Sequence, residues 1–244
     1  GPRGTPAIHG DTVYAFTGEG ILVAVKLDTG KIVWSKDTVK DLGGKPAEYG
    51  MACSPLYDNG LVIVTVGGTA GTVAAYDAQT GKRKWATGNN PAGYSSPTLL
   101  NVGGQNQIVA FVGNAALGIQ PESGALLWQY PYETNFDCNI ATPIAVDGNV
   151  FLSCGENHGS VMLALKQKGE KFDIGEVWQS QGTKSVLRNE WQTSILLDGY
   201  LYGLDNVGGA GPVTHLTCID AKTGKRMWQQ PRWGKGNLIA AEGK

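Results

Sequence analysis

The sequence has no apolar stretch long enough for a membrane helix and no excess of charge of either sign. Its longest apolar runs, such as Leu61 to Val66, have the length of a strand, whereas a membrane helix needs about 20 residues. The chain contains 20 basic and 21 acidic residues. We therefore expect no transmembrane segment, no nucleic-acid partner and no binding to an anionic membrane surface.

Residues that usually carry metal or redox chemistry are also few. None of the four cysteines are adjacent or in a C-x-x-C spacing, which argues against a zinc site: Cys53, Cys138, Cys154 and Cys218. Whether any of them form a disulfide stays open at this stage. The three histidines lie far apart, and no G-x-S-x-G motif is present. We predict no catalytic residue and no metal ligand.

Glycine, by contrast, is abundant, at 36 of 244 residues, where about 7% would be usual. Such an excess fits a fold with many tight turns. The chain does not open with a methionine, a basic segment or an apolar signal segment, so an export signal, if the gene encodes one, lies outside these residues.

The segment Ala75 to Trp85, AYDAQTGKRKW, is the unit that the chain repeats. It predicts a β-hairpin, because Thr80-Gly81 supplies a turn with a glycine suited to positive φ, and the Asp77 side chain can accept backbone N–H bonds across that turn. Equivalent tryptophans occur with spacings of 51, 43, 50 and 50 residues, at Trp34, Trp85, Trp128, Trp178 and Trp228. A period near 50 indicates an array of repeats.

A second signature precedes each hairpin, as in Thr5-Pro6 and Ser54-Pro55, and opens an apolar run that breaks at a turn such as Asn59-Gly60. Each repeat is therefore expected to form four antiparallel strands, the construction of a β-propeller blade. We predict an all-β fold and a single partial propeller over 1–244, with blades at about 5–34, 54–85, 96–128, 142–178 and 193–228 and the start of a sixth at 237–244. We expect this arc to be a fragment of a ring of seven or eight blades, because an open arc would leave edges uncovered.

The connectors between blades run from an outer strand back to an inner one, so their last residues approach the propeller axis. The predicted lining of an axial channel is Arg3, Tyr49, Tyr94, Asn139, Asn189, Glu190, Trp191 and Lys235. An alternative is that these side chains only fill the axis with hydrogen bonds.

The frame Ala-x-Asp-x-x-Thr-Gly-x-x-x-Trp resembles the PQQ-like β-propeller repeat family, and the resemblance covers essentially the whole chain. It implies that each repeat tryptophan docks against the neighbouring blade, and it implies export or a periplasmic location. The family includes quinoprotein alcohol dehydrogenases, which hold pyrroloquinoline quinone (PQQ) and calcium on the axis. It also includes non-catalytic scaffolds similar to the outer-membrane assembly lipoprotein of the Bam complex.

Three functions follow as hypotheses. The first is a non-catalytic scaffold that binds proteins and needs no cofactor; the alternatives are a PQQ-dependent oxidoreductase and a small-molecule or carbohydrate binder at the axial channel. A quinoprotein of this kind is expected to have two adjacent cysteines and a calcium-binding set of acids, whereas the loop acids here show no distinctive spacing: Asp41, Glu48, Glu133, Asp137 and Glu190. We also expect the chain to self-associate through exposed blade faces.

Overall fold

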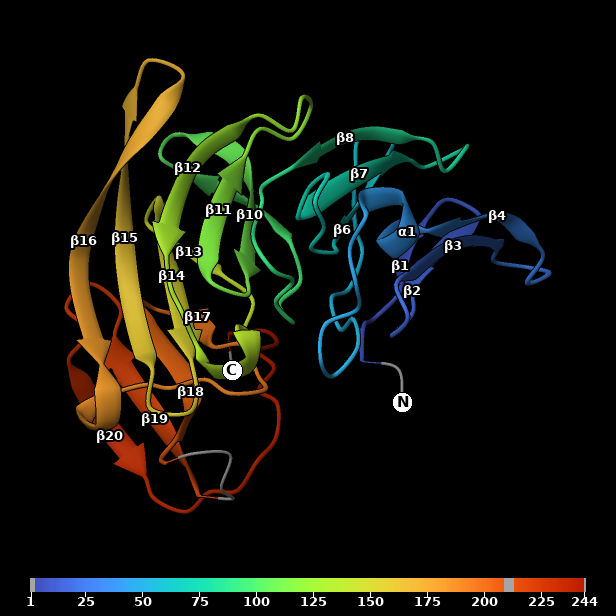
Figure 1. Ribbon diagram of the computed structural model, residues 1–244. Helices are drawn as coiled ribbons and strands as arrows, with labels where there is room; N and C mark the ends of the chain where they lie inside the picture. The colour runs from blue at the N-terminus through green and yellow to red at the C-terminus, as the bar shows by residue number, and fades with distance from the viewer. Residues whose placement is uncertain (1–2, 209–212, 244) are drawn as a thin grey trace. The chain divides into compact units, whose positions relative to one another are not determined.

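The computed structural model describes residues 3–208 and 213–243, which form five four-stranded antiparallel sheets (Figure 1). Within these described ranges, helix is confined to α1 (Thr38–Leu42) and two short 3-10 turns, η1 (Asn135–Asp137) and η2 (Gly182–Lys184). No helix among the described residues is long and apolar enough to cross a membrane. The predicted all-β architecture of four-stranded blades is confirmed.

Each sheet consists of four strands that are consecutive in the chain. The first contains β1 (Ala7–His9), β2 (Thr12–Phe16), β3 (Ile21–Lys26) and β4 (Ile32–Asp37), and the second β5 (Leu56–Asp58), β6 (Leu61–Thr65), β7 (Val73–Asp77) and β8 (Arg83–Thr87). The third contains β9 (Thr98–Val102), β10 (Gln105–Val112), β11 (Ala115–Ile119) and β12 (Leu126–Pro131). The fourth contains β13 (Ile144–Val146), β14 (Asn149–Cys154), β15 (Gly159–Lys168) and β16 (Lys171–Gln181), and the fifth β17 (Ile195–Leu197), β18 (Tyr200–Asn206), β19 (Thr214–Asp220) and β20 (Arg226–Gln230).

In four of the five described sheets, the first hairpin is closed by a two-residue turn with both residues in the left-handed region. Asp147 and Gly148, for example, have φ values of 48° and 79° between β13 and β14. The mirror-image geometry of such turns matches the twist of the flanking strands. Glu242 and Gly243 adopt similar values, 51° and 74°, although residues 237–241 form no strand.

The last hairpin is shaped by an aspartate and a β-bulge. The Asp77 carboxylate accepts hydrogen bonds from the Thr80 backbone N–H at 2.9 Å and the Thr80 hydroxyl at 2.8 Å, and Asp220 accepts the same pair from Thr223. A register shift follows the residue opposite each tryptophan, in the pairs Ala24–Trp34, Ala75–Trp85, Gly118–Trp128, Met162–Trp178 and Cys218–Trp228. A bulge bends its strand and increases the local twist.

The described chain forms two compact units, one of residues 3–99 and 106–139 and the other of residues 100–105, 140–208 and 213–243. The core of the first unit lies between neighbouring sheets, where Leu22, Tyr76 and Leu117 are fully buried. Phe151, Met162 and Leu201 form the corresponding core of the second. Alternating apolar residues on each strand produce these cores, because successive side chains point to opposite faces.

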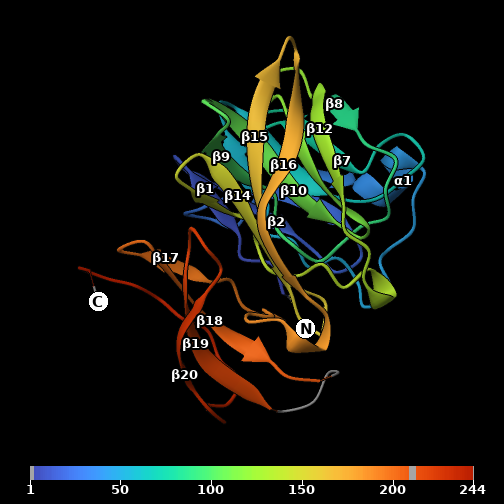
Figure 2. The same ribbon diagram turned by 90° about the vertical axis from the view of Figure 1, so that its left-hand side faces the viewer.

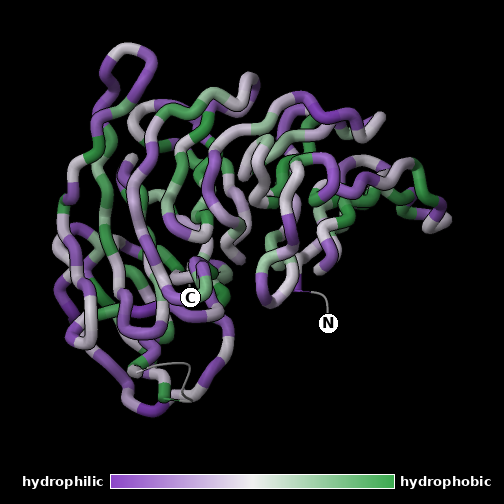
Figure 3. Tube along the Cα trace, in the orientation of Figure 1, coloured by the Kyte–Doolittle hydropathy of each residue, from purple (hydrophilic) through white to green (hydrophobic). Residues whose placement is uncertain are grey.

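The hairpin of β15 and β16 is longer than the others and extends past the rest of its own sheet (Figures 1 and 2). This repeat has no Thr-Gly turn at the corresponding place. The hairpin tip is hydrophilic (Figure 3) and carries an exposed ion pair between Lys168 and Asp173. Phe172 is the exception, because its side chain is buried and lies next to Gly103, where an added Cβ would come within 2.7 Å of the ring.

Candidate functional site

Three of the repeat tryptophans bind the turn of the following sheet. In each case the indole N–H donates to a backbone carbonyl of that turn: Trp34 to Ala78 at 2.9 Å, Trp85 to Pro121 at 3.0 Å and Trp178 to Ala221 at 2.9 Å. The turn glycine lies under the ring, and a Cβ added to Gly81, Gly124 or Gly224 would come within 2.8 Å of a ring atom. These tryptophans therefore fasten consecutive sheets together within each unit.

The other two tryptophans have different surroundings. The Trp128 indole N–H donates to the Gln107 side chain of its own sheet at 2.6 Å. Trp228 on β20 is 45% exposed and packs beside the Tyr202 ring, with 6.0 Å between the ring centroids. The indole N–H of Trp128 is therefore satisfied within its own sheet, and Trp228 lies beside a tyrosine ring of its own sheet.

The predicted axial residues gather in one cluster in each unit. In the first unit, Arg3 donates to the Tyr49 carbonyl, and the Tyr94 hydroxyl accepts from the Tyr49 N–H at 3.3 Å. The Asn139 carbonyl accepts from the Tyr94 N–H at 2.9 Å, while its side chain donates to the carbonyls of Val112 and Tyr132. Asn139 is thus a buried structural residue that holds this cluster together.

In the second unit the cluster stands on a buried loop, residues 185–194, between β16 and β17. A buried loop must find partners for its backbone polar groups. Serine side chains supply several, because Ser153 and Ser160 donate to the Leu187 carbonyl and the Asn189 N–H donates to the Ser153 hydroxyl. The Asn189 side chain donates a hydrogen bond to the Gln192 side chain and accepts one from the Ser194 hydroxyl. The loop therefore presents its side chains from a fixed backbone.

A buried ion pair fixes the same loop to β18. The Arg188 guanidinium makes two parallel contacts with the Asp205 carboxylate, 2.7 Å from Nε to Oδ1 and 2.8 Å from Nη2 to Oδ2. The Arg188 N–H also donates to Asp205, and both side chains are almost fully buried. Two parallel charge-assisted hydrogen bonds of this kind are stronger than neutral ones and fix the relative orientation of the two side chains.

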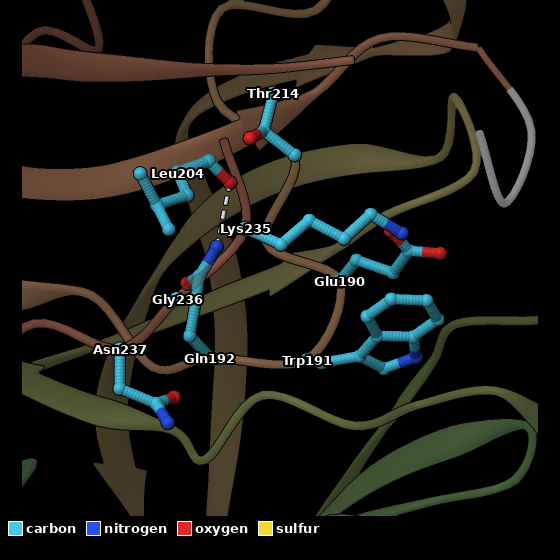
Figure 4. A pocket seen from close by; sticks show the side chains of 8 residues that line it. All are labelled: Glu190, Trp191, Gln192, Leu204, Thr214, Lys235, Gly236 and Asn237. Atoms are coloured by element: carbon cyan, nitrogen blue, oxygen red, sulfur yellow. Dashed lines mark hydrogen bonds and ion pairs between the residues drawn. The ribbon is translucent and has the colours of Figure 1, made fainter. Parts of the chain in front are cut away.

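A pocket of about 290 Å³ opens beside this loop (Figure 4). It is lined by Glu190, Trp191, Gln192, Leu204, Thr214, Lys235, Gly236 and Asn237. The charged ends of Glu190 and Lys235 lie side by side next to the Trp191 ring in Figure 4. The Lys235 ammonium is 3.4 Å from Glu190 Oε2 and 3.5 Å from the centroid of the indole.

Glu190 is the acid of this pocket and is only 5% exposed. Its Oε2 atom accepts from the Asn206 side-chain amide as well as from Lys235, whereas Oε1 is buried without a hydrogen-bond partner. Burial raises the pKa of the Glu190 carboxyl, and the Lys235 ammonium opposes that shift. Gly155 makes the close packing feasible, since a Cβ there would lie 2.7 Å from Glu190 Cβ.

The structure brings together Asn189, Glu190, Trp191 and Lys235, four of the residues proposed from the sequence. Sequence reasoning missed Arg188 and Asp205, and it did not select Gln192 or Asn206. One signal was available: the polar run Arg188 to Gln192 directly precedes a strand, a position expected near the axis. That the charges of Arg188 and Asp205 are buried and paired could not be read from their spacing.

The acidic side chain of this pocket is not placed as in a calcium site. Among the described residues there is no group of three or more His, Cys, Asp or Glu side chains placed to hold a metal ion. Calcium needs six to eight oxygen ligands. Here Glu190 already contacts the Lys235 ammonium, and the Asn189 side-chain oxygen already accepts a hydrogen bond from the Ser194 hydroxyl. A second cation at Glu190 would be repelled by Lys235.

The curated relatives include both enzymes and assembly factors. The chain is 38% identical over 255 residues to the quinohemoprotein alcohol dehydrogenase ADH IIB of Pseudomonas putida, covering 90% of this chain and 35% of that protein. It is 23% identical over 245 residues to the outer membrane protein assembly factor BamB of Yersinia pestis, covering 98% and 59%. The chain thus spans between about a third and three fifths of the length of these relatives.

Two solved structures share the fold. BamB from Moraxella catarrhalis matches with a TM-score of 0.63 at 15% identity, over 95% of this chain and 62% of that one. The quinohemoprotein alcohol dehydrogenase from Comamonas testosteroni matches with a TM-score of 0.54 at 16% identity, over 95% and 60%. The PQQ_2 family model, described as outer membrane protein assembly factor BamB, matches residues 1–230. The chain therefore belongs to this family of PQQ-type propeller repeats.

Proposed function

We propose that the chain is part of an exported, non-catalytic propeller that binds other proteins as an assembly scaffold. The observation that carries this proposal is the exposure of large aromatic side chains on the connectors. Tyr49 in the first unit is 50% exposed, and Trp191 and Trp233 in the second are 56% and 59% exposed. Tyrosine and tryptophan are the residues that most often dominate binding energy at protein interfaces.

The backbone that carries these aromatic residues is held in place by hydrogen bonds and buried neighbours. Tyr49 is held by Tyr94 and Arg3, and Trp191 follows the buried residues Asn189 and Glu190. A side chain presented from a fixed backbone loses little conformational entropy when a partner binds. The family match over residues 1–230 and the BamB relatives support the same role.

The 38% identity to a quinohemoprotein alcohol dehydrogenase supports one enzymatic alternative to the scaffold, namely a PQQ-dependent oxidoreductase. We favour the scaffold because the acid in the pocket, Glu190, is paired with Lys235 and because the cysteines Cys53, Cys138, Cys154 and Cys218 are not adjacent in the sequence. Cys53 is also a poor nucleophile, because burial raises the pKa of its thiol to about 12.

The test is reconstitution of the purified protein with PQQ and Ca²⁺, followed by gel filtration. We expect no quinone absorbance in the protein peak and no reduction of an artificial dye with alcohols or sugars. Retained quinone together with substrate-dependent dye reduction would make the protein an oxidoreductase and overturn the proposal. A known quinoprotein dehydrogenase, stripped and reconstituted in parallel, controls for the loading procedure.

A further inference from the structure

Two connectors of the first unit, the one before β5 and the one before β13, meet at Tyr94. The Tyr94 hydroxyl accepts a hydrogen bond from the Tyr49 N–H at 3.3 Å, and the centroids of the two tyrosine rings are 6.0 Å apart. The Tyr94 N–H donates to the Asn139 carbonyl at 2.9 Å. Burial raises the pKa of the Tyr94 phenol, and the charge of Glu48 and the thiol of Cys138 add to that shift, so both connectors approach the same hydroxyl.

The second of these connectors holds the ring of Phe136 in solvent through an unusual backbone. Phe136 and Asp137 have φ values of 57° and 55°, in the left-handed region that residues with a Cβ rarely adopt. The Asp137 carbonyl accepts a hydrogen bond from the Asn139 N–H at 2.8 Å, and a Cβ added to Gly113 would lie 2.7 Å from Asp137 Cβ. The Phe136 side chain is 60% exposed. The fold therefore fixes a strained turn that presents an apolar ring without burying it, and strain of this kind is concentrated at functional sites.

Acidic side chains accompany the two exposed aromatic rings. Glu48 precedes Tyr49, which is 50% exposed, Asp137 follows Phe136, and Glu133 lies on the same connector as Phe136. Among the residues that the structure describes, none of these three carboxylates takes part in an ion pair. We call these five residues the connector surface. It combines exposed aromatic rings with carboxylates that have no counterion.

We propose that the connector surface binds a short basic segment of a partner protein, one that contains arginine and an apolar side chain. An arginine guanidinium stacks on the exposed Tyr49 ring and pairs with Glu48, because a planar guanidinium suits both an aromatic face and a carboxylate. The apolar side chain packs against Phe136. This inference rests on the proposed protein-binding function and names the chemistry of the partner.

The charges of the connector surface argue against other kinds of partner. Its three carboxylates outnumber the two cations of the same region, Arg3 and Lys45, and the Arg3 guanidinium already donates to the Tyr49 carbonyl. An acidic segment would be repelled by the carboxylates. A purely apolar segment would remove them from water without pairing them, which is unfavourable.

The experiment measures peptide binding to the purified full chain by fluorescence anisotropy. The probes are three fluorescein-labelled peptides of equal length in which leucine alternates with arginine, with serine or with glutamate. We expect the arginine–leucine peptide to bind, the serine–leucine peptide to bind at least tenfold more weakly and the glutamate–leucine peptide not to bind. Tyr49→Ala should weaken the binding of the arginine–leucine peptide by about tenfold or more, the size expected for truncation of an aromatic hot spot.

Phe136→Gly separates the loss of the ring from a loss of folding. Glycine suits the left-handed backbone, so this variant should unfold at no lower urea concentration than the unaltered chain, yet bind the peptide about tenfold more weakly or worse. Glu48→Gln should weaken binding by about twofold to fivefold, as for a solvent-exposed charge pair. The matched controls are Trp233→Ala and Glu170→Gln, which remove an exposed aromatic ring and an exposed carboxylate of the second unit and should leave binding unchanged.

Three results would overturn the inference: no binding of the arginine–leucine peptide, equal binding of the glutamate–leucine peptide, or binding in Tyr49→Ala and Phe136→Gly that matches the two controls. None of these results bears on the scaffold itself. The scaffold proposal fails instead if the reconstituted protein retains quinone and reduces the dye.

Discussion

Replacing the turn glycine Gly124 by alanine should cost far more stability than the same change at Gly30. Both glycines have positive φ, 71° and 67°, in equivalent turns of the same unit. An alanine in the left-handed region costs roughly 1–2 kcal/mol, so both variants lose at least that amount. Any difference between them comes from what the new methyl group contacts.

The contacts at the two positions are very different. A Cβ at Gly124 would lie 2.5 Å from Cδ2 of Trp85, whereas at Gly30 it would meet nothing within 4 Å. Trp85 is buried and tied to the Pro121 carbonyl at 3.0 Å, so the ring has little room to retreat. Forcing a methyl group into such packing costs a further 1–3 kcal/mol, which gives about 2–5 kcal/mol for Gly124→Ala and about 1–2 kcal/mol for Gly30→Ala.

The assay is urea-induced unfolding of each variant, followed by circular dichroism. A double-mutant cycle isolates the contact: in a Trp85→Ala background, the loss of unfolding free energy caused by Gly124→Ala should fall to that of Gly30→Ala. Equal losses at Gly124 and Gly30 in the unaltered background, within about 0.5 kcal/mol, would refute the conclusion that the tryptophan and the turn fasten the sheets together.

Three further predictions use the same unfolding assay. Arg188→Met should destabilise the second unit by about 3–5 kcal/mol because it leaves Asp205 buried and unpaired, and Arg188→Met/Asp205→Leu should recover most of that loss; no recovery would contradict a purely electrostatic cost. Asp77→Ala should cost about 1 kcal/mol at pH 7 through the lost turn hydrogen bonds. The bond from Thr80 lowers the pKa of Asp77, so its contribution is present above the unfolded pKa of about 3.9 and is lost as the pH falls through the folded value; a difference that persisted at pH 2 would contradict this. Relative to Glu190→Gln, the unaltered protein should lose stability as the pH rises through the folded pKa of Glu190, because burial raises that pKa and the protonated carboxyl favours folding; the opposite trend would contradict a desolvated carboxyl.

The features that the sequence predicts well are those whose chemistry is local. The Asp77 side chain bonds to groups two and three residues ahead, and Gly81 supplies the positive φ of the same turn, so the hairpin follows from adjacent residues. The tryptophan period then predicts four-stranded sheets. The β-bulge opposite each tryptophan escaped prediction, because a bulge depends on how two strands pair rather than on either strand alone.

In the candidate site, too, the positions of residues could be predicted from the sequence, whereas their contacts could not. Glu190 and Lys235 are 45 residues apart and were both expected near the axis, because each ends a connector. Their ion pair, and the pairing of Arg188 with Asp205, depend on long-range packing. A buried charge and a solvated charge have the same letter in the sequence, and only the fold distinguishes them.

Site-specific photo-crosslinking in the native host tests the central proposal most directly. A photoreactive phenylalanine analogue is placed at Tyr49 or Trp191, and at Thr29 on an exposed outer turn as a control. If the protein is a scaffold, Tyr49 and Trp191 should each give discrete crosslinks to the same few exported proteins, and Thr29 should give none of them. The absence of discrete crosslinks from either connector, or identical products from all three positions, would contradict the proposal that the connectors bind partner proteins.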